Sequence, residues 1–271
     1  MANKILYLCL CGLVLWSLFS TTASAQECAG WKRFSAECRT GEIALSSQVS
    51  VLSGDYGTGI NTTITSLAET VKYTEDIGDI SLTIPYLFRN GGGVTPGETV
   101  VATTNAIPNS ANGIGDVVLK GKYYWLEETD VMPGVDVTLR IKFPTASRDQ
   151  GLGTGRFDLG GGLSWMKRFG KLIGMLDTEL VRRQRPRGST LKSTRFDYSI
   201  GAGHPLTNKS TGYVFLDGST KSSSSGGAPL ELVLLGNYKP KKSFSANGYV
   251  LLGLTDESSD IGVGIGITQR F

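Results

Sequence analysis

Residues 135–143 read VDVTLRIKF, and this stretch decides the fold class. Its apolar residues take every second position, and the residues between them are polar: Asp136, Thr138, Arg140 and Lys142. Successive side chains of a strand point to opposite faces. A face that carries three charges cannot lie in a dry core, because it needs water or opposite charges beside it. The pattern therefore predicts a strand with one apolar face and one wet face.

The same alternation recurs along the chain in segments of about ten residues bounded by turn residues, which is typical of an outer-membrane β-barrel. The second segment is the weakest, because Glu69 makes its face assignment ambiguous. An even number of strands is expected of a single-chain bacterial barrel. About twelve segments are predicted: 42–53, 62–74, 77–89, 113–126, 132–145, 156–168, 170–183, 195–204, 211–220, 229–239, 242–254 and 259–271.

The connections and the aromatic residues agree with a membrane-spanning barrel. Tight turns such as EDIG and FGK alternate with long polar loops such as SRDQGLGTG and QRPRGSTLKST, as expected if the turns and both termini are periplasmic and the loops point outward. Aromatic residues gather at both interfaces of membrane proteins. One predicted belt holds Tyr123, Trp125, Trp165, Tyr238 and Phe271, and the other holds Tyr86, Phe88, Phe143, Phe157, Phe196 and Tyr198.

Two other fold classes fit less well. After Gln26, charged residues and glycines interrupt every apolar stretch before it reaches the roughly 20 residues of a membrane helix. A soluble secreted β-sandwich would explain the alternation, but it gives no reason for charged strand faces, aromatic belts or alternating loop lengths. We therefore predict an all-β, transmembrane, up-and-down antiparallel β-barrel of about twelve strands over residues 42–271.

The N-terminal region predicts export. Residues 1–25 combine Lys4, an apolar run and a small-residue end at Ala23–Ala25, the layout of a cleaved signal peptide rather than of a membrane anchor. Residues 26–41 are predicted to form a short periplasmic segment with a Cys28–Cys38 disulfide, because two close cysteines in a secreted chain usually pair. A metal or haem site is the poorer alternative, since the chain has one histidine and no CxxCH.

Composition and charge limit the partners. A formal net charge of +3 is too small to indicate nucleic-acid binding. We expect no metal and no cofactor. The expected location is the outer membrane of a Gram-negative bacterium, where the partners would be outer-membrane lipid, lipopolysaccharide, the barrel-assembly machinery during biogenesis and a small-molecule solute.

Charged residues on the inward strand faces are the candidate functional residues. Two interpretations stay open: a self-neutralising network that fills a narrow barrel, or a polar pathway whose selectivity depends on unpaired charges. Strand parity assigns eleven residues to this lumen-lining set: Asp116, Lys120, Lys122, Asp136, Arg140, Lys142, Asp158, Asp177, Glu179, Arg183 and Glu231.

Catalytic motifs are scarce, so we predict that the protein is not an enzyme. An outer-membrane lipid hydrolase would need a serine activated by a histidine, and His204 has no carboxylate at strand spacing. GLGTG at 151–155 precedes a predicted strand rather than the helix that a phosphate loop needs. We interpret it as a flexible or tightly turned outer loop. The alternatives to a channel are therefore a hydrolase that depends on His204 and a closed structural barrel that binds a partner through its outer loops.

The middle of the chain resembles a known family. GIGDVVLKGKYYW and LRIKFPTASRDQGLGTGRFDLGGGLSW are similar to the family described as "Putative MetA-pathway of phenol degradation". The motif positions are Gly115–Asp116, Tyr123, Lys142, Pro144–Thr145, Gly151–Gly155 and Asp158, within residues 77–170. The resemblance implies a Gram-negative outer-membrane barrel that acts as a channel or transporter for small aromatic or otherwise hydrophobic compounds. It implies no catalytic residue. We predict that this transport is passive.

The C-terminal stretch IGVGIGITQRF predicts the closing strand. Ile261, Val263, Ile265 and Ile267 would face lipid, and the glycines between them would face the lumen. An unpaired edge in a membrane must find a partner, so this strand is expected to pair with residues 43–51. Phe271 resembles the terminal aromatic signal that barrel-assembly machinery recognises, although Gln269 departs from an all-apolar face.

Overall fold

The computed structural model describes residues 41–91, 109–184, 192–221 and 227–271, and every regular element in them is a β-strand. The signal peptide and the Cys28–Cys38 pair lie outside these residues. Among the described residues, no helix is long and apolar enough to cross a membrane. The strands are β1 (Glu42–Gly54), β2 (Thr62–Glu75), β3 (Gly78–Asn90), β4 (Ser110–Ile114), β5 (Val117–Leu126), β6 (Gly134–Phe143), β7 (Asp158–Phe169), β8 (Leu172–Arg183), β9 (Thr194–Pro205), β10 (Ser210–Ser219), β11 (Leu230–Lys241), β12 (Phe244–Gly253) and β13 (Ile261–Arg270).

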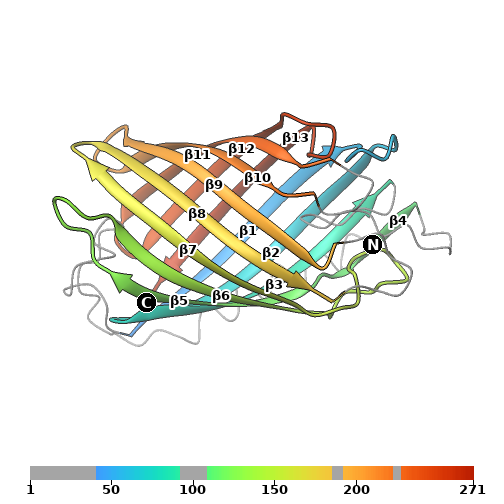
Figure 1. Cartoon of the computed structure of the whole chain (residues 1–271), viewed down its shortest axis with the longest axis horizontal. Coiled ribbons are helices and arrows are strands. Elements are labelled where there is room, and N and C mark those ends of the chain that lie inside the picture. The colour runs from blue at the N-terminus through green and yellow to red at the C-terminus, as the bar shows by residue number, and fades with distance from the viewer. Residues whose placement is uncertain (1–40, 92–108, 185–191, 222–226) are drawn as a thin grey trace.

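The strands form a closed antiparallel barrel in which sequence neighbours are also spatial neighbours (Figure 1). β4 and β5 both pair with β3 and together occupy one position of the ring. The barrel therefore has twelve strand positions and one short extra strand, which confirms the predicted fold class. Figure 1 shows the strands tilted steeply across the barrel, as closure of a sheet requires.

The predicted strand 113–126 is interrupted at Gly115–Asp116, the point where the chain passes from β4 to β5. Gly115 N donates to Pro85 O at 2.8 Å, and a Cβ at residue 115 would lie only 2.9 Å from the Pro85 ring. Asp116 belongs to neither strand, and its Oδ1 accepts a hydrogen bond from Ala146 N. The interruption thus aims a carboxylate at the connection that follows β6.

The seam between the first and last strands closes as predicted. β1 and β13 pair without a break from Ala44–Arg270 to Ser53–Ile261. Beyond this register, Phe271 N donates to Ile43 O at 2.8 Å, and Ile43 N donates to Phe271 O at 3.3 Å. No unpaired edge remains at this seam.

The outward face of the barrel is apolar and carries aromatic residues near both ends. Leu139 and Ile265 are 63% and 69% exposed on this face. At the end with the long connections, called the loop end here, the rings form the pairs Tyr86–Phe88, Phe143–Phe157 and Phe196–Tyr198. At the opposite turn end, Tyr73, Tyr123, Trp125, Phe169 and Tyr238 are exposed. This is the surface that a bilayer covers.

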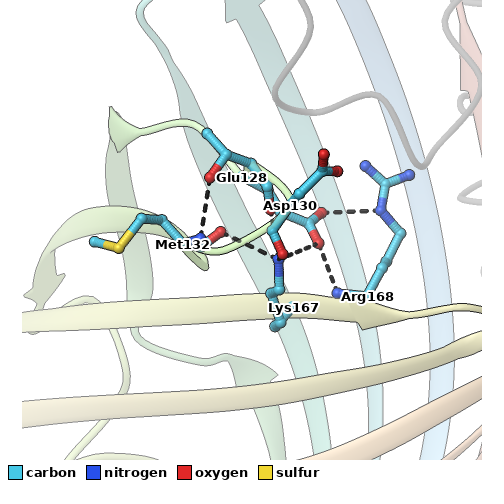
Figure 2. Close-up of polar contacts among 6 residues, drawn as sticks. Glu128, Asp130, Met132, Lys167 and Arg168 are labelled. Carbon is cyan, nitrogen blue, oxygen red and sulfur yellow. Dashed lines mark hydrogen bonds and ion pairs between the residues drawn. The ribbon is translucent and has the colours of Figure 1, made fainter.

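The β5–β6 connection, residues 127–133, is the longest described connection at the turn end, and it is tied to β7 (Figure 2). Glu128 accepts hydrogen bonds from Arg168 N at 2.6 Å and from Arg168 Nε at 2.9 Å. Lys167 Nζ donates to the carbonyl oxygens of Thr129 and Asp130. These contacts fix the connection against the turn end of β7.

Candidate functional site

Lys142 is the centre of a buried ion-pair network on the inner face of β6. Its Nζ lies 2.9 Å from Asp116 Oδ2 and 3.0 Å from Asp158 Oδ2, and it donates to Thr154 Oγ1 at 3.2 Å. The β4–β5 interruption supplies Asp116, β7 supplies Asp158 in register with Lys142, and the β6–β7 connection supplies Thr154. Asp116, Lys142, Thr154 and Asp158, which belong to the motif that carries the family resemblance, therefore meet at one place. Tyr123 of the same motif is exposed at the turn end.

The β6–β7 connection turns into the barrel instead of extending away from it. Leu152, at its tip, is 1% exposed and packs with Leu87 and Ala146. Arg89 Nη2 donates to Gln150 O at 2.9 Å, which holds the tip from β3. We call residues 146–155 the inward loop. The sequence left open whether GLGTG at 151–155 forms a flexible loop or a tight turn. In the structure it forms a tight turn.

An ion pair between Arg140 and Glu179 crosses the inner surface of β7. Arg140 Nε lies 2.6 Å from Glu179 Oε1, although β6 and β8 are separated by a strand. Gly160 leaves the necessary space, since a Cβ there would lie 1.9 Å from that carboxylate oxygen. The pair can therefore lie flat against the barrel wall. A larger residue at position 160 would push the pair inward and narrow the lumen.

The other predicted lumen residues have varied surroundings. Lys122 Nζ lies 3.4 Å from Asp136 Oδ2, and Glu231 Oε1 accepts a hydrogen bond from Ser259 N at 3.0 Å. Lys120 and Asp177 are exposed, and Arg183 is buried opposite Asp158 in the β7–β8 register. The structure thus brings nine of the eleven predicted residues into buried or hydrogen-bonded positions: Asp116, Lys122, Asp136, Arg140, Lys142, Asp158, Glu179, Arg183 and Glu231.

The sequence-based set missed several charged residues on the inner face, among them Arg89, Arg195, Asp197 and Asp217. Arg195 pairs with Asp197 at 2.6 Å, Asp217 accepts a hydrogen bond from Ser199, and Arg89 is 3% exposed. Asp197 alternates with Phe196 and Tyr198, so parity could have identified it. Arg89 and Arg195 lie within two residues of a strand end, where alternation gives a weaker assignment.

An apolar strip, which sequence reasoning also missed, lines the inner face of β10–β12. Val214 is exposed on the outward face, so its neighbours Tyr213 and Phe215 point inward, where their rings stack at 6.0 Å between centroids. Val233 and Leu251, paired in register, are each 8% exposed. The full inward strip is Tyr213, Phe215, Val233, Leu235, Tyr249 and Leu251.

Glycines on neighbouring strands let these rings lie against the wall. A Cβ at Gly201 would lie 2.2 Å from the Phe215 ring, and one at Gly264 would lie 2.2 Å from the Tyr249 ring. Glycine in a strand often marks such a close approach. The rings therefore cover the wall rather than block the lumen, and they lie across the twelve-position ring from β3, β5 and β6.

A cavity of about 300 Å³ lies inside the barrel beside the inward loop. Its apolar side comes from Leu52, Ile64, Pro85, Leu87, Val118 and Leu152. Its charged side comes from Asp116, Arg140, Lys142, Asp158, Arg183 and Arg195. A solute at this position would meet hydrocarbon on one side and charged hydrogen-bonding groups on the other.

His204 is remote from this interior. It lies on the outward face of β9, is exposed, and pairs in register with Gly212. This position places the imidazole outside the ion-pair network and the cavity.

Known structures share the fold. The chain resembles the COG4313 outer membrane channel from Pseudomonas putida F1, with 11% sequence identity, 93% of this chain and 100% of that chain covered, and a TM-score of 0.68. It also resembles the NanC porin, with 11% identity, 84% of this chain and 100% of that chain covered, and a TM-score of 0.51. No curated protein matches the chain.

The closed ring, the apolar outer face and these likenesses define the class: a β-barrel of the outer-membrane type. The chain belongs to the family described as "Putative MetA-pathway of phenol degradation", whose model matches residues 43–271. The match extends well beyond residues 77–170, where the motifs that carry the resemblance lie.

Proposed function

We propose that the protein is a passive outer-membrane channel for small aromatic or otherwise hydrophobic solutes that carry a polar group. The observation that supports this proposal is the two-sided interior, in which the apolar strip on β10–β12 lies across the ring from the charged side of β5 and β6. The membership of the family named for phenol degradation agrees with such a cargo.

The two sides would act on different parts of the same solute. Tyr213, Phe215 and Tyr249 offer ring faces and edges on which an aromatic solute can stack. Arg140 and Lys142 are charged donors for a hydroxyl or carboxylate group. Because each cation already has a carboxylate partner, a solute would be held weakly, and weak binding permits release.

The inward loop would set the size limit. Leu152 projects from this loop toward Leu87 and narrows the lumen beside the cavity. A twelve-strand barrel is intermediate between small barrels filled by side chains and open porins of about 16–18 strands. Solutes larger than a substituted single ring would be excluded.

Several further features belong to the same proposal. Residues 1–25 would be removed on export, residues 26–41 would carry the Cys28–Cys38 disulfide, and both termini would be periplasmic. The long loops would then face the lipopolysaccharide leaflet. The apolar–polar layout of residues 1–25 and the alternation of short and long connections support this orientation.

Solute uptake into proteoliposomes tests the channel. Labelled 4-hydroxybenzoate and arabinose would be compared for the wild type and for Phe215→Ala, with Phe196→Ala as the control that removes an aromatic ring from the outer face. We expect Phe215→Ala to slow 4-hydroxybenzoate uptake about three- to tenfold, with arabinose uptake and the Phe196→Ala variant unchanged. A folded barrel that passes neither solute and shows no openings in planar bilayers would overturn the proposal.

A further inference from the structure

Glu69, whose face the sequence leaves ambiguous, lies on the outward face near the middle of β2. In register it stands beside Ser47 of β1 and Ile84 of β3. Its neighbours on the same face of β2 are Leu67 and Val71, and Val71 is 50% exposed. A carboxyl group is therefore placed in the apolar band that lipid chains would cover.

This position is unusual within the barrel. In the described strands, the other outward-facing acidic, basic and histidine side chains lie at a strand end or within two residues of one, as Lys167, Arg182 and His204 do. Water and headgroups can reach such ends, but they do not reach mid-strand. Polar side chains are costly on the lipid face, and most so near the bilayer midplane.

One hydrogen bond within the barrel satisfies only part of the carboxyl group. Ser47 Oγ donates to Glu69 Oε2 at 2.6 Å. Lipid chains carry no hydrogen-bond donor for the remaining oxygen. A neighbouring protein can supply one, and polar side chains of this kind strengthen protein–protein contacts in membranes.

We propose that the outward face of β1 and β2 around Ser47 and Glu69 is the contact between two copies of this chain, related by a two-fold axis along the membrane normal. Two copies in one membrane hold residue 69 at the same depth, so the donor–acceptor pair of one copy meets the same pair of the other. A two-fold contact needs a self-complementary patch. The Ser47 hydroxyl is already donated to Glu69 of the same copy, so the proposed contact has each Glu69 in its protonated form, which donates one hydrogen bond and accepts others.

The shape of the patch permits close approach. The outward side chains around the pair are aliphatic and of moderate size: Leu45, Val49, Leu67, Val71, Ile84 and Ile267. The nearest outward ring is Tyr86, on β3 beside Leu67, and the exposed rings Tyr73 and Phe88 lie farther toward the ends of their strands. Two barrels could therefore bring their β1–β2 walls together if the contact is centred on β1 and β2 and Tyr86 lies at its edge.

Site-specific photocrosslinking and native mass spectrometry test this inference independently of channel activity. A benzophenone amino acid would replace Val49 beside the pair, and in a control it would replace Leu176 on β8, across the ring. We expect the full-length chain to crosslink to itself from position 49 and not from position 176. Crosslinks from position 49 to lipid alone or to a different protein would overturn the proposal.

Two substitutions at residue 69 test the chemistry. Glu69→Gln keeps a group that donates and accepts hydrogen bonds, so dimers should persist. Glu69→Leu removes the group and should raise the dissociation constant about tenfold. The heat-dependent mobility of the barrel on gels checks that each variant is folded. A folded wild-type protein that is monomeric in vesicles, or equal dimerisation of Glu69→Leu and wild type, would contradict the inference.

Discussion

Lys142 and Asp158 face each other in register across β6 and β7, with Lys142 Nζ 3.0 Å from Asp158 Oδ2. The same ammonium group lies 2.9 Å from Asp116 Oδ2, so one buried cation lies between two carboxylates. The β6–β7 connection, which contains the inward loop, leaves β6 one residue after Lys142 and joins β7 at Asp158. The ion pair therefore closes the base of this loop.

Replacing the cation should destabilise the barrel. In Lys142→Met, Asp116 and Asp158 would be buried without their shared cation, which typically costs about 3–5 kcal/mol. Urea unfolding of the refolded protein in lipid vesicles measures the loss. Lys120→Met is the matched control, because Lys120 is exposed on the next strand and should cost less than about 1 kcal/mol. Equal stability of the two variants would contradict the structural role of Lys142.

Shortening the tip of the inward loop should widen the pathway. Leu152→Ala removes a fully buried side chain beside the cavity, so we expect a loss of about 2–5 kcal/mol and a higher single-channel conductance. Planar-bilayer recordings measure the conductance. Leu152→Met conserves volume and should resemble the wild type. Unchanged conductance in a folded Leu152→Ala protein would show that the loop does not set the limiting width.

A side chain at position 160 should push an ion pair into the lumen. In Gly160→Ala the new Cβ would clash with Glu179, so the Arg140–Glu179 pair must move away from the wall. We expect a lower conductance and altered ion selectivity, measured from reversal potentials in a salt gradient. Gly121→Ala is the control, since a Cβ there meets no atom within 4 Å. Identical behaviour of the two alanine variants would refute this role of the glycine.

Removing the last residue should impair assembly more than transport. Deleting Phe271 removes its two hydrogen bonds with Ile43 and the terminal aromatic group. The barrel-assembly machinery would then lose its proposed recognition element. We expect less folded protein in the outer membrane, measured by heat-dependent gel mobility, while protein refolded in vitro should conduct like the wild type. Normal insertion in cells would argue against Phe271 as an assembly signal.

The sequence by itself determined the architecture, because strand alternation is a local property. Residues 135–143 read as one wet and one apolar face without knowledge of any partner strand. Repeating that pattern gave about twelve strands, and the glycine-spaced residues 261–271 gave the closing seam with β1. The inward charges on β6 followed from parity alone.

Only the tertiary structure decided what the interior looks like, because its contacts join residues that are distant in sequence. Arg140 meets Glu179 across 39 positions, and Arg89 holds Gln150 across 61. Neither alternation nor composition specifies which side chains of different strands lie at the same depth in the barrel. They also do not specify whether a loop turns inward. The β4–β5 interruption, the inward loop, the apolar strip and the outward position of Glu69 all depend on the register that closure of the ring imposes.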